Sequence, residues 1–98
     1  MQTKLLINGA LVAGEGEALA VYNPSLGSVL VQTTEASRLQ VHAAVQSADA
    51  AFETWSQTPP KDRAALLLKL ADSIDAQASV FARLEADNCG KPFSAVLQ

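Results

Sequence analysis

The spacing of apolar residues in this chain changes once, at Ser37. Before Ser37, short apolar runs alternate with turn residues, which is typical of β-strands; after it, apolar residues recur every three or four positions, which is typical of α-helices. No strand pattern follows the helical part, so the sequence lacks a parallel βαβ unit. The predicted fold class is therefore α+β, with N-terminal β-hairpins followed by two or three α-helices.

Residues 4–34 are predicted to form strands and hairpins. The pair Asn8-Gly9 favours a type I′ turn, because both residue types tolerate positive φ. A second turn is expected at Asn23–Gly27, with Pro24 presetting φ at its second position and Gly27 in the left-handed region. The strands expected beside these turns are Leu5–Ile7, Ala10–Val12, Ala18–Tyr22 and Val29–Val31.

Residues 37–57 are predicted to form one helix, and residues 58–90 one or two more. Ser37 and Gln40 have the spacing of a capping box. Thr58 is expected to cap the next helix, with Pro59 in its first turn, and Gly90 is expected to end the last one. Apolar stripes at helical spacing predict the buried faces: Val41, Val45, Ala48, Phe52 and Trp55 in the first helix, and Ala64, Leu67, Leu70, Ala71 and Ile74 in the second.

The residues of the types that form catalytic, metal or cofactor sites are better explained by structural roles. Cys89 lies at a predicted helix C-terminus, where the helix dipole disfavours a thiolate. His42 has no second metal ligand at a suitable spacing and is expected on the helix surface. Gly14 and Gly16 lack the third glycine and the following helix of a dinucleotide fingerprint, which favours a loop. No catalytic or cofactor-binding residue is assigned.

Composition excludes several partners. Seven Lys and Arg against ten Asp and Glu give a net charge of -3, and the basic residues are scattered, so neither nucleic acid nor an anionic membrane is an expected partner. No apolar run approaches the ~20 residues of a membrane span. One cysteine allows no internal disulfide, and a cytoplasmic location is expected.

A length of 98 residues cannot hold both a dinucleotide-binding domain and a substrate domain. One-sided helices and a sheet with uncovered faces indicate an incomplete domain, residues 1–98 of something larger. The alternative is a free-standing small helical interaction domain that docks through the Val41 to Trp55 stripe.

Four motifs resemble the N-terminal region of the aldehyde dehydrogenase superfamily, in its order and spacing. They are the hairpin Leu6–Gly9, the turn Tyr22–Gly27, the helix Ala43–Phe52 leading to Trp55, and the stretch Leu84–Pro92. Within the superfamily, Asn88–Pro92 and Lys69–Asp72 look most like gamma-aminobutyraldehyde dehydrogenases, with betaine aldehyde dehydrogenases next.

The resemblance implies part of a larger α/β fold and an NAD-dependent oxidation of an aminoaldehyde, such as 4-aminobutyraldehyde in putrescine breakdown. The family's nucleophilic cysteine, its glutamate and its cofactor glycines lie downstream, and Cys89 matches a structural position. The resemblance therefore implies that this segment is scaffolding, inactive alone, in a parent that forms dimers or tetramers.

The resemblance also implies a structural sodium or potassium ion. The matching positions are the carbonyls of Val21 and Tyr22 and the side chain of Asn88. Relatives carry an acidic side chain where this chain has Asn88. An amide oxygen still coordinates a hard cation, but loss of the charge is expected to weaken the site.

Overall fold

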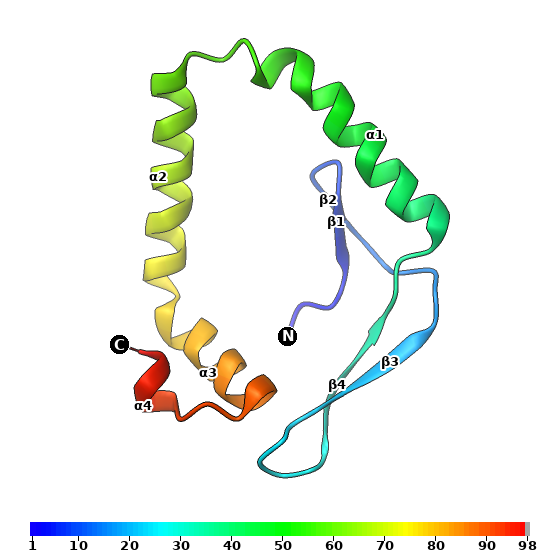
Figure 1. The fold of residues 1–98 in the computed structure, drawn as a ribbon, viewed down its shortest axis with the longest axis vertical. Helices are drawn as coiled ribbons and strands as arrows, with labels where there is room; N and C mark the ends of the chain where they lie inside the picture. Colours follow the sequence, from blue (N-terminus) through cyan, green and yellow to red (C-terminus); the bar gives the residue numbers. More distant parts are fainter. Residues whose placement is uncertain (98) are drawn as a thin grey trace. The chain divides into compact units, whose positions relative to one another are not determined.

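The computed structural model describes residues 1–97, with four strands followed by four helices (Figure 1). The chain divides into two compact units. Unit 1 is Met1–Val21 with Val31–Gln57, and unit 2 is Tyr22–Leu30 with the chain from Thr58 onward. This order of strands and then helices confirms the α+β prediction.

The N-terminal hairpin has the predicted type I′ geometry. Strands β1 (Leu5–Ile7) and β2 (Ala10–Val12) pair antiparallel, with Leu6 opposite Leu11. Asn8 has φ 53° and Gly9 has φ 73°, as the turn requires. Leu6 and Leu11 lie on the exposed face of the hairpin, while Leu5, Ile7 and Val12 are half-buried.

Strands β3 (Ala18–Tyr22) and β4 (Val29–Thr34) form a second two-stranded sheet. The predicted turn between them is confirmed: Gly27 has φ 70°, and its N–H donates to the Asn23 carbonyl at 2.8 Å. The buried Asn23 side chain adds a feature that was not predicted. Its Oδ1 accepts from the N–H groups of Ser25 and Leu26, at 2.9 and 3.2 Å. This Asx turn stabilises the loop between β3 and β4 through hydrogen bonds inside the loop.

Helix α1 (Arg38–Trp55) begins at the predicted capping box. Its predicted buried stripe is wrong. Val45 and Phe52 are 63% and 65% exposed, and Trp55 is 42% exposed. The side chains that face the hairpin are small: Ala48, which belongs to the predicted stripe, and Ala44, Ser47 and Ala51, which lie to one side of it. At 3.6 residues per turn, the centres of these two faces differ by roughly 70° around the axis.

The segment predicted as one or two helices forms two, α2 (Pro60–Ala76) and α3 (Ala78–Cys89), which meet at Gln77. The predicted cap is wrong by one residue, because Pro59 rather than Thr58 occupies the N-cap position. Pro60 holds the preceding residue in an extended conformation, so Pro59, with ψ 140°, cannot be helical.

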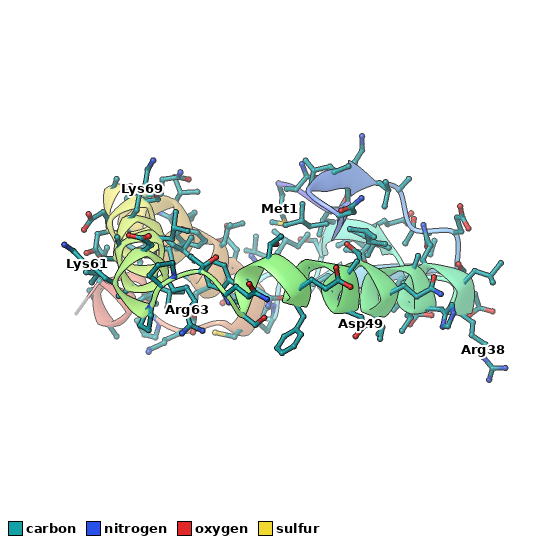
Figure 2. The ribbon with its side chains drawn as sticks, turned by 90° about the horizontal axis from the view of Figure 1, so that it is seen from above. Met1, Arg38, Asp49, Lys61, Arg63 and Lys69 are labelled. Carbon is teal, nitrogen blue, oxygen red and sulfur yellow. The ribbon has the colours of Figure 1, made fainter. Side chains whose placement is uncertain are left out.

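The predicted buried stripe of α2 is also wrong. Leu67, Leu70 and Ile74 are 48% to 61% exposed, and Lys61 and Lys69 project from α2 into solvent (Figure 2). Among residues 1–97, Ala82 of α3 is the only buried apolar residue. The apolar faces of α1 and α2 are therefore present as predicted, but the described chain does not bury them.

Gly90 ends α3 in the left-handed region, at φ 76°, as predicted. A further short helix, α4 (Phe93–Val96), follows Pro92. The described part of the chain thus has four helices rather than the predicted two or three. The guanidinium of Arg83 lies 4.5 Å from the centre of the Phe93 ring, a cation–π contact that holds α4 against α3.

Candidate functional site

Gln40 joins three segments of unit 1. Its Nε2 donates to the carbonyl of Ala13 at 2.8 Å, and its Oε1 accepts from the N–H groups of Glu15 and Ser37 at 2.9 and 3.0 Å. The Ser37 hydroxyl also donates to the Glu15 carboxylate at 3.4 Å. The capping box therefore fastens the loop after β2 to the first turn of α1. We call these four residues the Gln40 clamp.

The two glycines of that loop allow two backbone segments to approach closely. A Cβ at Gly14 would lie 2.3 Å from the Thr34 carbonyl oxygen and 2.5 Å from that of Glu35. The N–H of Gly16 donates to the Glu35 carbonyl at 2.8 Å. Strand β3, rather than a helix, comes next after this glycine pair, which confirms its interpretation as a loop.

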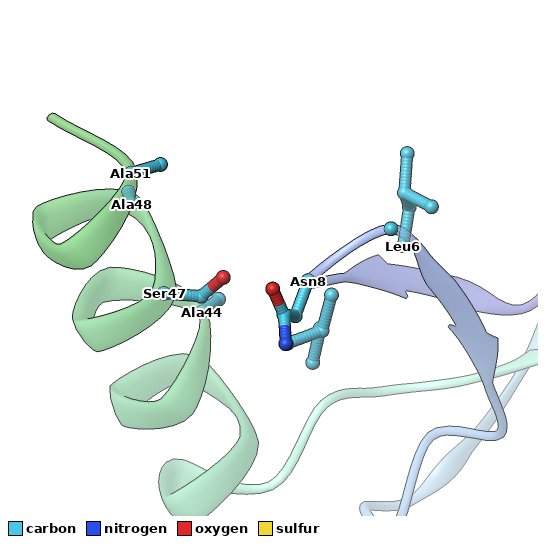
Figure 3. Close-up of a pocket in the computed structure, with 8 residues that line it drawn as sticks. Leu6, Asn8, Ala44, Ser47, Ala48 and Ala51 are labelled. Atoms are coloured by element: carbon cyan, nitrogen blue, oxygen red, sulfur yellow. The ribbon is translucent and has the colours of Figure 1, made fainter. Parts of the chain in front are cut away.

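A shallow hollow of about 380 Å³ lies between the hairpin and α1 (Figure 3). Its lining is mostly apolar and small, and the side chains of Asn8 and Ser47 point toward one another across it. The lining residues are Leu6, Ile7, Asn8, Gly9, Ala44, Ser47, Ala48 and Ala51. None of these lining side chains is a carboxylate, imidazole, amine or thiol, and Ser47 carries their one hydroxyl.

In unit 2, the turn before β4 lies against the end of α3. A Cβ at Gly90 would lie 3.1 Å from Cγ of Pro24. Cys89, next to this contact, is an exposed free thiol. The positive φ of 76° favours glycine at position 90, and a Cβ there would also crowd the Pro24 ring.

The three predicted cation ligands are not all in one unit. Tyr22 and Asn88 belong to unit 2, and both are exposed. Val21 belongs to unit 1. Because the turn that follows Tyr22 packs on the helix end that carries Asn88, unit 2 brings the segments of these two residues together.

Acidic and metal-binding side chains do not cluster in the described chain. Residues 1–97 contain no group of three or more His, Cys, Asp or Glu side chains that could hold a metal ion. His42 is exposed on α1, which confirms its predicted surface position. The helices of residues 1–97 include none that is long and apolar enough to cross a membrane.

Two sets of contacts that organise these sites were not predicted: the Asx turn of Asn23 and the bonds of Gln40 to the loop after β2. Asn23 carried a usable signal, because an Asn that opens a turn commonly accepts hydrogen bonds from backbone N–H groups two and three residues later. The capping role of Gln40 was predicted, but its bonds to Ala13 and Glu15 were not, since they join residues 25 to 27 positions apart.

The chain matches known proteins along nearly its whole length. Residues 11–98 match the aldehyde dehydrogenase family. N-Succinylglutamate 5-semialdehyde dehydrogenase from Chromobacterium violaceum is 37% identical over 92% of this chain and 18% of its own length. Phenylacetaldehyde dehydrogenase from Pseudomonas fluorescens is 38% identical over 90% of this chain and 18% of its own length.

Solved structures agree with these relatives. A putative aldehyde dehydrogenase from Burkholderia cenocepacia superposes with a TM-score of 0.93 at 38% identity, over 99% of this chain and 20% of that one. An NAD⁺ complex of aldehyde dehydrogenase from Bacillus cereus gives 0.91 at 37% identity, with the same coverage. The chain thus spans about a fifth of the length of the proteins it matches.

The relatives are named for different aldehydes, so the match supports the predicted family but not gamma-aminobutyraldehyde dehydrogenase in particular. The strands and helices match the N-terminal part of the family's α/β fold. With the family match over residues 11–98 and identities of 37% to 38%, this chain belongs to the aldehyde dehydrogenase family.

Proposed function

We propose that this chain is the N-terminal scaffolding segment of an NAD-dependent aldehyde dehydrogenase, and that it is inactive alone. The observation that carries the proposal is the apolar surface of α1 and α2. Burying a large apolar side chain contributes about 1.5–3 kcal/mol, yet the large apolar side chains of these helices are exposed. A stable fold requires a cover for such faces, and the relatives are about five times as long as this chain.

The clamp and the turn give the segment a defined framework. The Gln40 clamp fixes the entry to α1, and the contact between Pro24 and Gly90 fixes the end of α3. In the clamp, the Ser37 hydroxyl caps the first turn of α1 and donates to the Glu15 carboxylate. The segment's contribution is therefore to support other parts of a longer enzyme, which would contain the reacting groups.

NAD is proposed as the cofactor of the longer enzyme, because the Bacillus cereus relative was solved as an NAD⁺ complex. Gly14 and Gly16 are occupied by their contacts with the backbone of residues 34 and 35, so they cannot cradle a pyrophosphate. The parts of the enzyme outside this segment would bind the cofactor.

An aminoaldehyde such as 4-aminobutyraldehyde is proposed as the substrate, which is oxidised to the acid. The support is the resemblance of Asn88–Pro92 and Lys69–Asp72 to gamma-aminobutyraldehyde dehydrogenases. Two relatives are named for other aldehydes, N-succinylglutamate 5-semialdehyde and phenylacetaldehyde, which are the alternative substrates to test. Values of kcat/KM for the full-length enzyme on these three aldehydes test the proposal, which fails if 4-aminobutyraldehyde is not the best.

A weak monovalent cation site is proposed at the Tyr22 carbonyl and the Asn88 amide oxygen, with Val21 as the third expected ligand. Both unit 2 donors are neutral oxygens, which suit sodium or potassium better than a divalent ion. Asn88→Asp is expected to tighten potassium binding roughly fivefold, because a charge at an exposed site contributes about 1 kcal/mol. Equal potassium affinities of the two proteins, measured by calorimetry, would rule the site out.

The longer enzyme is also proposed to be a cytoplasmic dimer or tetramer that acts on small molecules. Its partners would be an aldehyde, NAD and further copies of itself. Sedimentation of the full-length protein measures the oligomeric state, and a monomer at micromolar concentration would contradict this part of the proposal.

The direct test of the function compares two purified proteins, the 98-residue chain and the product of the gene read beyond codon 98. NADH production from an aldehyde is expected only from the longer product. Turnover by the pure 98-residue chain would overturn the scaffolding role. If the reading frame closes after codon 98 and the chain is a cooperatively folded monomer, the free-standing interaction domain takes its place.

A further inference from the structure

We draw no further inference here: the strongest candidate, the exposed apolar face of α1 formed by Val41, Val45, Phe52 and Trp55, carries nothing because the described residues 1–97 do not show what covers it.

Discussion

The two compact units are stabilised by different kinds of contact. In unit 1, three hydrogen bonds of the Gln40 clamp join residues 22 to 27 positions apart in the sequence. In unit 2, the side chain of Asn23 bonds to residues two and three positions away, and packing of Pro24 near Gly90 joins the turn to α3.

This difference shows which part of the chain defines its own geometry. Hydrogen bonds between distant residues have strict distances and angles, so unit 1 specifies how its loop and helix meet. Contacts between apolar groups are less directional and depend on complete coverage. We therefore expect unit 2, and α2 above all, to depend more strongly on the rest of a longer enzyme.

The largest expected effect is that of Gly14→Ala in unit 1. The added Cβ would lie 2.3 Å from the Thr34 carbonyl oxygen, so the loop after β2 and the end of β4 must separate, which should lower the free energy of unfolding by about 2–4 kcal/mol. Amide hydrogen exchange in the full-length enzyme should show lost protection at residues 13–17 and 34–40. Gly9→Ala is the matched control: it has open space around it and only its positive φ to strain it, at about 1 kcal/mol. Equal effects of the two variants would contradict the close approach.

Gln40→Leu is expected to have the second largest effect. It should lower the free energy of unfolding by about 2–3 kcal/mol, because it removes one donor and one shared acceptor. Gln40→Glu should also destabilise unit 1: its carboxylate still accepts from the N–H groups of Glu15 and Ser37, but its second oxygen would face the Ala13 carbonyl oxygen, which Nε2 contacts at 2.8 Å. The same exchange measurement reports both variants. Gln46→Leu, on the exposed surface of the same helix, is the control. If Gln40→Leu behaved like this control, the clamp would not stabilise unit 1.

Asn23→Ala tests the corresponding element of unit 2. The variant removes the acceptor for the N–H groups of Ser25 and Leu26, which should lower the free energy of unfolding by about 1–2 kcal/mol. Exchange should speed up at residues 25–28 and leave the clamp unchanged. Asn23→Asp keeps an acceptor oxygen and should restore most of the protection. Faster exchange throughout unit 1 would show that the two units are not independent.

The smallest expected effect is that of Arg83→Met, which removes the cation above Phe93. An exposed cation–π contact contributes about 0.5–1 kcal/mol, so α4 should fray while α3 keeps its protection. Arg83→Lys keeps the positive charge, so α4 should lose less of its exchange protection than in Arg83→Met. An unchanged exchange rate at residues 93–96 in Arg83→Met would show that the contact does not hold α4.

The sequence predicted the features that depend on neighbouring residues. Asn8-Gly9 specifies its own turn, and Ser37 with Gln40 specifies a helix start, because the required groups lie within four positions. The face of α1 that meets the hairpin was not predicted. Periodicity favoured the larger side chains, whereas the hairpin lies against alanines that allow closer approach. Such choices depend on contacts between distant segments, which spacing alone does not encode.

Less of the candidate site than of the fold was predicted from the sequence. Tyr22 and Asn88 were assigned through the resemblance, and unit 2 brings their segments together through the contact between Pro24 and Gly90. Catalytic residues were not expected in this segment, and that expectation still awaits the activity assay.

The central claim is that this chain is a segment whose apolar helix faces require a longer aldehyde dehydrogenase to cover them. Sedimentation of the purified 98-residue chain, with its thermal melt followed by circular dichroism, tests this claim most directly. We predict self-association and a broad, non-cooperative loss of helix, because exposed apolar faces associate with one another. A monomer that unfolds in one sharp cooperative transition would contradict the claim.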